Sequence, residues 1–225
     1  MAKNRGWFDG CLPSRHNMGG ELRKLAMILS KLPKHPQKSV ELEQYSTEGD
    51  FAARWIAAII ECGDISEESN IIDFGAGNGI LGIGLLLAGV STATFIEKDE
   101  EAVESIRVGI KNMDLENKSL IICKDIVDCE QWLNENEYDL IIMNPPWGFQ
   151  NPKADRPFLE LAFSSSAPVI HLLHSANVSH PQAIARDAGW NSELLLEGSF
   201  RLPAQYEHHR KPMAESAVKC WRFYR

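Results

Sequence analysis

From residue 70 onward, short apolar segments that suit β-strands alternate with segments of helical periodicity, and this order constrains the fold most. Apolar runs such as Leu140–Met143 are continuous, as expected when helices cover both faces of a sheet. A strand reached through a helix lies parallel to the strand before it, so the order predicts an α/β fold with a doubly wound, mostly parallel sheet. The predicted strands are Asn70–Phe74, Thr92–Glu97, Ser119–Cys123, Tyr138–Met143 and Val169–Leu173, and the predicted helices are Ile80–Ala88, Glu100–Met113, Glu130–Asn134, Arg156–Ser164 and Pro181–Ala188.

The C-terminal part departs from this alternation. Glu193–Phe200 and Ser216–Tyr224 have the pattern of strands, and the polar segment Arg201–Glu215 between them has no helical pattern. Two strands joined without a helix are expected to be antiparallel. We therefore expect a seven-stranded sheet that a C-terminal antiparallel hairpin closes.

The region before this core divides into two parts. Residues 1–20 contain scattered glycines and a proline without sustained periodicity, which predicts a flexible tail. Residues 21–48 begin with a predicted helix, Glu21–Leu32, which Pro33 ends. Residues 49–225 are predicted to form one core domain, which starts with a second helix after Gly49.

The composition is that of a globular protein with one sizeable core. The chain has 225 residues, of which 44% are hydrophobic and 24% are charged. Its longest apolar run, Ile80–Val90, is shorter than the roughly 20 residues that cross a bilayer, and the N-terminus has no apolar core of a signal peptide. We therefore expect a cytoplasmic protein. The five cysteines include no C-x-x-C pair, which predicts reduced thiols and no metal site.

The loop after the first predicted strand has the pattern of a cofactor-binding turn. It reads Asp73-Phe74-Gly75-Ala76-Gly77-Asn78-Gly79, and Gly75, Gly77 and Gly79 allow the backbone to approach a ligand closely. Asp73 is a candidate for binding an amino group, and Glu97 for binding the hydroxyls of a ribose. S-adenosylmethionine fits this arrangement, but the spacing between Gly77 and Glu97 also fits a dinucleotide. The loop favours S-adenosylmethionine and leaves the dinucleotide open.

A third acidic residue, Asp125, follows the third predicted strand. At that position it is placed to accept a hydrogen bond from the adenine amino group of the cofactor. An Asp in such a place also commonly caps a helix. Asp125 is therefore a candidate cofactor-binding residue with a second, purely structural interpretation.

A second loop, Asn144-Pro145-Pro146-Trp147, follows the fourth predicted strand. The carboxyl ends of parallel strands meet at one edge of the sheet, so this loop is expected to face the same crevice as the glycine loop. The two prolines hold the backbone rigid and lack N–H groups, which leaves the Asn144 amide oxygen and the proline carbonyls as acceptors. These acceptors suit a planar amino group, and Trp147 offers a ring on which its base can stack. We predict Asn144, Pro145, Pro146 and Trp147 as catalytic residues, with Asn144 also contacting the cofactor.

Together these motifs resemble class I S-adenosylmethionine-dependent methyltransferases of the amino-methylating kind, which have a Rossmann-like fold and an (Asn/Asp)-Pro-Pro-aromatic motif. Within that class the chain is most similar to the methyltransferase-like protein five family of small-subunit rRNA adenine-N6 methyltransferases and their archaeal relatives. The resemblance covers all but roughly the first twenty residues. It rests on Leu42-Glu43-Gln44-Tyr45-Ser46-Thr47, the glycine loop, Glu97-Lys98-Asp99, Met143-Asn144-Pro145-Pro146-Trp147-Gly148, Leu172-Leu173-His174-Ser175, Leu202-Pro203-Ala204-Gln205-Tyr206 and His209-Arg210-Lys211.

The resemblance implies roles that the local pattern does not indicate. Gln44, Tyr45 and Thr47 would form a lid over the methionine part of the cofactor. A small zinc-binding activator subunit would add to the edge of the third strand, where Leu120–Cys123 is apolar. This sequence has Trp147 where the family usually has Phe, and Glu97 where Asp is frequent.

The charge distribution bears on the substrate. The formal net charge is −8, which by itself argues against a nucleic-acid partner. Residues 1–38 nevertheless contain 8 basic and 2 acidic residues, and residues 201–225 contain 6 basic and 2 acidic ones. Two basic ends therefore flank an acidic body, and we expect them to hold RNA through its phosphates. The candidate RNA-binding residues are Arg201, His209, Arg210 and Lys211.

Other functions remain open at this stage. Protein glutamine-N5 methyltransferases of the release-factor type share the Asn-Pro-Pro motif, but they have a larger N-terminal helical domain than this chain offers. A DNA adenine methyltransferase would normally bring a target-recognition domain. A cofactor-binding but inactive partner subunit would not need to keep Asn144, Pro145 and Pro146 intact.

Overall fold

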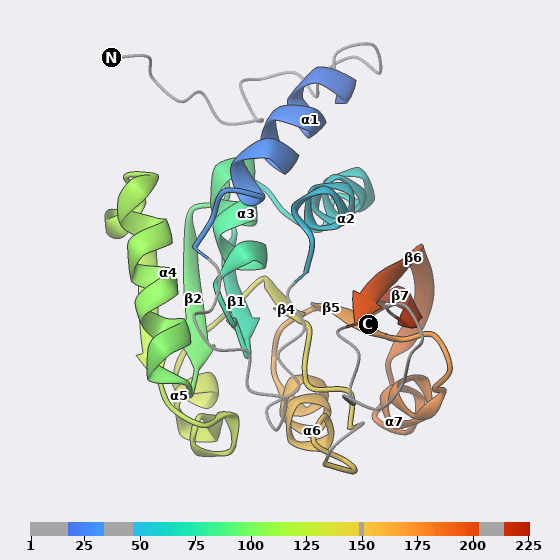
Figure 1. Ribbon diagram of the computed structural model, residues 1–225. Helices are drawn as coiled ribbons and strands as arrows, with labels where there is room; N and C mark the ends of the chain where they lie inside the picture. The colour runs from blue at the N-terminus through green and yellow to red at the C-terminus, as the bar shows by residue number, and fades with distance from the viewer. Residues whose placement is uncertain (1–17, 34–46, 149–150, 203–213) are drawn as a thin grey trace, which may run out of the picture.

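The computed structural model describes residues 18–33, 47–148, 151–202 and 214–225, and its strands form one seven-stranded sheet (Figure 1). The strands are β1 (Asn70–Phe74), β2 (Thr92–Glu97), β3 (Ser119–Cys123), β4 (Leu140–Met143), β5 (Val169–Ser175), β6 (Asn191–Leu202) and β7 (Ala214–Tyr224). Their order across the sheet is β3-β2-β1-β4-β5-β7-β6. The first five strands are parallel, and β7 runs antiparallel between β5 and β6. This confirms the predicted α/β class and the C-terminal hairpin.

The helices cover both faces of the sheet (Figure 1). The helices that precede β3 pack on one face of the sheet, and the helices that follow β3 pack on the other. Neighbouring strand residues point to opposite faces, so Ile71 belongs to the core on the first face and Ile72 to the core on the second. The first group is α1 (Met18–Leu29), α2 (Gly49–Cys62), α3 (Ile80–Ala88) and α4 (Glu100–Asn112), and the second is α5 (Glu130–Glu135), α6 (Arg156–Ser164) and α7 (His180–Asp187).

Several element boundaries differ from the prediction by a few residues. Helix α1 begins three residues before the expected Glu21 and ends at Leu29, where the Ser30 hydroxyl donates to the Ala26 carbonyl. The next two backbone N–H groups, of Lys31 and Leu32, bond three residues back to Ile28 and Leu29, so the α-helix ends before Leu32 although Leu32 is buried. Strand β5 continues to Ser175 because it pairs with β7 there, a contact that local propensity does not report.

A buried charged cluster fastens the C-terminal hairpin to the rest of the sheet. Asp64, in the loop between α2 and β1, accepts hydrogen bonds from His171 on β5 and from Arg222 on β7, with Arg222 Nε 2.7 Å from Asp64 Oδ2. Burial raises the pKa of Asp64, but the bonds from His171 and Arg222 outweigh it and leave this pKa below its ordinary value. The carboxylate is therefore ionised at neutral pH and joins three segments that are distant in the sequence.

No helix within these described ranges has both the length and the apolar character that crossing a membrane requires.

Candidate active site

The two motif loops begin at neighbouring strand ends. Strand β1 pairs with β4, and Phe74, the last residue of β1, lies opposite Met143, the last residue of β4. The glycine loop and the Asn-Pro-Pro-Trp loop therefore leave the sheet side by side at its carboxyl edge, as the sequence predicted. This edge is where open α/β sheets bind their ligands.

The glycine loop has a left-handed backbone that only glycine adopts readily. Gly75 and Gly77 have φ values of 64° and 57°. A Cβ at Gly75 would lie 2.9 Å from the Phe158 ring, whereas a Cβ at Gly77 would meet no described atom within 4 Å. The loop thus packs closely against α6 on one side and leaves open space at Gly77, which suits a ligand lying over the loop.

Asp73 is buried beneath this loop. Its Oδ2 accepts a hydrogen bond of 2.9 Å from the Gly82 N–H in the first turn of α3, which ties the strand end to the helix. Burial is the main reason that the pKa of Asp73 rises to about 7, and the nearby Glu97 charge adds to this effect. A carboxyl that titrates near neutrality at a ligand-binding edge is a candidate functional group, and its contact with an amino group stays a prediction.

Glu97, the last residue of β2, is also buried. Its carboxylate accepts N–H bonds from Gly77 at 2.7 Å, from Lys98 at 2.8 Å and from Asp99 at 3.0 Å. Burial raises the pKa of Glu97 above its ordinary value, although these three bonds favour the ionised form. A carboxylate offers about four lone-pair sites, so Glu97 retains the capacity to accept a ribose hydroxyl beside the open space at Gly77.

Asn144 connects the catalytic loop to the predicted lid. Its Nδ2 donates to Thr47 Oγ1 at 3.2 Å, and its Oδ1 accepts from Trp147 Nε1 at 3.1 Å. The structure therefore brings Thr47 and the second motif together, although 97 positions separate them in the sequence. Gln44 and Tyr45, the other two predicted lid residues, lie outside the described residues.

Trp147 lies deeper than its predicted role suggests. Only 5% of this residue is exposed. The Trp147 ring lies nearly parallel to the Phe200 ring, with centroids 6.1 Å apart, and to the His174 ring, with centroids 6.2 Å apart. Sequence reasoning treated the indole as an open platform for a base, but the hairpin and β5 bring two further rings against it. A base that stacks on Trp147 must therefore approach beside these rings or displace one of them.

The third acidic candidate for cofactor binding, Asp125, caps a helix, which is the second of the two roles that its sequence position allows. It accepts a bond from the Val127 N–H and so caps a short 3-10 helix, Ile126–Asp128. Its carboxylate also pairs with Lys98 Nζ at 3.3 Å. Since β2 and β3 are paired in register, Asp125 lies just beyond the strand end next to Glu97, where an adenine contact stays a prediction.

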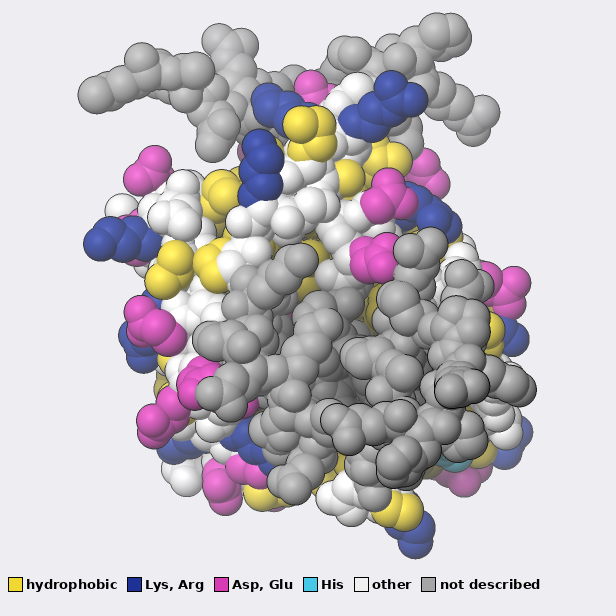
Figure 2. Space-filling view, viewed as in Figure 1, with side chains coloured by type: hydrophobic (Ala, Val, Ile, Leu, Met, Phe, Trp, Pro, Cys, Tyr) yellow, Lys and Arg dark blue, Asp and Glu magenta, His cyan; other side chains and the backbone are white. Residues whose placement is uncertain are grey.

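The predicted RNA-binding residues lie largely outside the described part of the chain. Arg201 is near the end of β6, where its backbone lies opposite Glu215 of β7 in the strand register. His209, Arg210 and Lys211 are outside the described residues. The other basic end is described in part, and Figure 2 shows Lys and Arg side chains around α1. Arg23, Lys24 and Lys31 are exposed.

The fold and the site together define a class I methyltransferase. A glycine loop follows β1, a buried acidic residue ends β2 and an Asn-Pro-Pro-Trp loop follows β4 of a sheet with the order β3-β2-β1-β4-β5-β7-β6. The chain belongs to the methyltransferase small domain family, whose pattern matches residues 46–169. It is an enzyme of the S-adenosylmethionine-dependent class, which decides between the two cofactors that the glycine loop left open.

Relatives along nearly the whole chain support this assignment. An uncharacterised protein of Methanocaldococcus jannaschii is 31% identical over 208 residues, which are 89% of this chain and 92% of that protein. The rRNA N6-adenosine-methyltransferase METTL5 of Danio rerio is 27% identical over 205 residues, 90% of this chain and 98% of that protein. The crystal structure of PH1948 from Pyrococcus horikoshii, a candidate RNA methyltransferase, has a TM-score of 0.77 at 30% identity and covers 91% of this chain and 96% of that one.

Proposed function

We propose that this protein transfers a methyl group from S-adenosylmethionine to the N6 amino group of an adenine in RNA, with small-subunit ribosomal RNA as the substrate. The observation that carries the proposal is the position of Asn144, held by Thr47 and Trp147 at the end of β4 and next to the glycine loop. The names of relatives such as METTL5 of Danio rerio support adenine in rRNA as the target.

The loop residues would hold the adenine amino group in its reactive geometry. S-adenosylmethionine supplies a methyl group on a positively charged sulfur. The N6 lone pair of adenine is delocalised into the ring and is a weak nucleophile. Acceptors at Asn144 Oδ1 and the Pro145 carbonyl favour the developing cation over the flat ground state, because they bind the N–H groups more strongly as positive charge builds up.

Alignment is the main contribution expected from the protein. Holding two reacting groups in line can lower a barrier by about 7–11 kcal/mol. We assign no residue as a dedicated general base, because the amino proton can leave to water after the transfer. The target adenine must first leave its stack, which costs a few kcal/mol. Stacking beside Trp147 and contacts with RNA phosphates would offset that cost.

The decisive experiment is to incubate the protein with labelled S-adenosylmethionine and ribosomal RNA from its own source, and then to identify the labelled nucleoside. We expect N6-methyladenosine in small-subunit RNA and no label in large-subunit RNA. A parallel reaction contains a release factor in place of RNA. Label on a glutamine of that factor, with none on RNA, would overturn the proposal in favour of the glutamine-N5 alternative.

We also propose that the basic ends grip the RNA. The double variant Arg210→Ala/Lys211→Ala is expected to bind RNA more weakly and to lower the slope of log affinity against log salt by about 1.4, since each lost phosphate contact removes about 0.7 for a single strand. Cofactor affinity should stay unchanged. The matched control is Lys111→Ala/Lys118→Ala, which removes two exposed basic residues from the acidic body. An equal loss of RNA binding in both double variants would contradict a localised grip.

The edge of β3 is the proposed site for a small zinc-binding activator subunit, as the family resemblance implies. No described strand pairs with the outer side of β3, and Leu120 and Val127 beside it are 45% and 61% exposed. We expect Leu120→Lys to abolish the complex with such a subunit in size-exclusion chromatography. Val108→Lys on α4 is the control, because Val108 is a similarly exposed apolar residue at 39%. Full activity of the chain alone, with no complex formed, would contradict this partner.

A further inference from the structure

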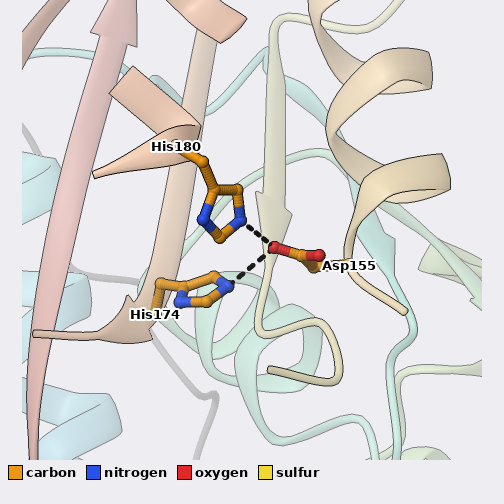
Figure 3. A group of neighbouring side chains, drawn as sticks. All are labelled: Asp155, His174 and His180. Atoms are coloured by element: carbon orange, nitrogen blue, oxygen red, sulfur yellow. Dashed lines mark hydrogen bonds and ion pairs between the residues drawn. The ribbon is translucent and has the colours of Figure 1, made fainter. Parts of the chain in front are cut away.

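Two histidines and one aspartate point toward one another (Figure 3), and one of them, His174, lies against Trp147 of the catalytic loop. Asp155 precedes α6, His174 lies on β5 and His180 is the first residue of α7. His174 Nε2 is 3.0 Å from Asp155 Oδ2, and His180 Nε2 makes a hydrogen bond to the same oxygen. These three potential ligand atoms all lie within 4.8 Å of one another.

The cluster is closed on one side and open on the other. The side chains of Asp155 and His174 are almost fully buried, whereas that of His180 is 45% exposed. A carboxylate and two imidazoles therefore face one another, and the exposed His180 side chain leaves the cluster open toward solvent.

A comparison within the molecule shows what distinguishes this cluster. Asp64 also binds a buried histidine, His171, but its carboxylate is held in addition by the guanidinium of Arg222, with Nη2 2.6 Å from Asp64 Oδ1. The positive charge beside Asp64 is therefore that of the Arg222 guanidinium, which stays protonated. At Asp155 a second imidazole, His180, takes the corresponding place, and no Lys or Arg among the described residues forms an ion pair with Asp155.

We propose that Asp155, His174 and His180 bind a divalent transition-metal ion, and that Zn²⁺ is the ion they suit best. Two imidazole nitrogens and one carboxylate oxygen are a ligand set of known zinc sites, in which a water or another group takes the fourth position. Ca²⁺ and Mg²⁺ are less suitable because they prefer sites made of oxygen ligands. The cysteine pattern predicts no metal site, but these three residues are dispersed in the sequence and form no local motif.

The ion would act on the catalytic loop through packing and would not touch the reacting atoms. The His174 ring lies nearly parallel to the Trp147 ring, at an angle of 28°, and Trp147 donates to Asn144. Fixing His174 by a metal bond would therefore fix the ring against which Trp147 packs. The ion would be a structural group that joins β5, α7 and the segment before α6.

The test is direct binding of Zn²⁺ to the full chain after treatment with a chelator and its removal. A competition titration against a chromogenic chelator should give one Zn²⁺ per chain. His180→Ala should lower the affinity at least about 100-fold, because loss of a ligand costs at least as much as loss of the groups that orient it. His180→Cys replaces one zinc ligand with another and should restore binding. Arg186→Ala is the matched control on the exposed side of α7 and should bind like the wild type.

Two further readouts separate metal binding from a merely structural role of His180. Zn²⁺ should raise the Tm of the wild type and of His180→Cys but leave that of His180→Ala unchanged. Co²⁺ should give the intense visible absorption of four-coordinate cobalt in the wild type but not in His180→Ala. Absence of Zn²⁺ binding, or equal affinity in the wild type and His180→Ala, would overturn the site. None of these measurements depends on methyl transfer, so the proposal stands or falls separately from the proposed activity.

Discussion

Asn144→Ala is expected to lower kcat for methyl transfer by about 10²–10³-fold or more, the range found when a single group that stabilises developing charge is removed from an active site. The Kd for S-adenosylmethionine should change much less than kcat, because Asp73, Glu97 and the glycine loop keep their hydrogen bonds when the Asn144 side chain is removed. Isothermal titration would give the Kd, and single-turnover transfer to RNA would give the rate of the chemical step.

The hydrogen bonds of Asn144 require two controls. Trp147→Phe keeps a ring but removes the indole N–H that Asn144 Oδ1 accepts, and Thr47→Val removes the hydroxyl that accepts from Asn144 Nδ2. Each loses one hydrogen bond worth about 0.5–1.5 kcal/mol, so each should slow transfer by about 2–10-fold. If Asn144→Ala lost cofactor binding as severely as transfer, the division between cofactor and amino-group residues would be wrong.

The second large effect is expected from Asp73→Asn, and it depends on pH. In the folded protein burial raises the pKa of Asp73 from 3.8 to about 7. The native carboxyl therefore holds its proton up to about pH 7, whereas the unfolded chain loses it near pH 4. The stabilising contribution of this group is fully present below pH 4 and is lost as the pH rises to 7. The total loss amounts to roughly 4 kcal/mol.

Asn at position 73 cannot ionise and can still accept the Gly82 N–H through its amide oxygen. The free energy of unfolding of each protein can be measured by urea denaturation. The value for Asp73→Asn minus the value for the wild type should therefore increase as the pH rises from 4.5 to 7.5. Glu97 remains in both proteins, and its contribution differs between the two curves only by its interaction with the Asp73 charge. Parallel pH dependence of the two proteins would show that Asp73 is ionised throughout this range.

Cofactor binding should report the same titration. If ionised Asp73 binds the positively charged amino group of S-adenosylmethionine, the affinity should rise about tenfold per pH unit below pH 7 and level off above it. Up to one proton should be released on binding, which titrations in buffers of different ionisation enthalpy would measure. Asp73→Asn should bind more weakly and without this pH dependence. A wild-type affinity that does not change between pH 5.5 and 7.5 would contradict the proposed contact.

The sequence was sufficient to predict which strand ends carry the candidate site residues, because strands and their ends follow from local patterns. Continuous apolar strands such as Leu140–Met143, separated by helices, were sufficient to predict a parallel sheet, and residues directly after strand ends necessarily lie at one edge of it. Asp73, Glu97 and Asn144 could be predicted as candidate site residues for this reason. The register of β1 with β4 then placed the two loops side by side, in agreement with the prediction.

Contacts between distant segments depended on the tertiary structure alone. Phe200 and His174 lie against Trp147 only because the hairpin and β5 pack beside the catalytic loop, so no local pattern could show that the indole is buried. Likewise, 25 positions separate Asp155 and His180, and they converge because the end of β5 and the beginnings of α6 and α7 lie close together (Figure 3). The sequence by itself determined the alternation of elements and the residues at the strand ends. The tertiary structure decided which side chains surround the catalytic loop, because those contacts arise only when separate elements pack together.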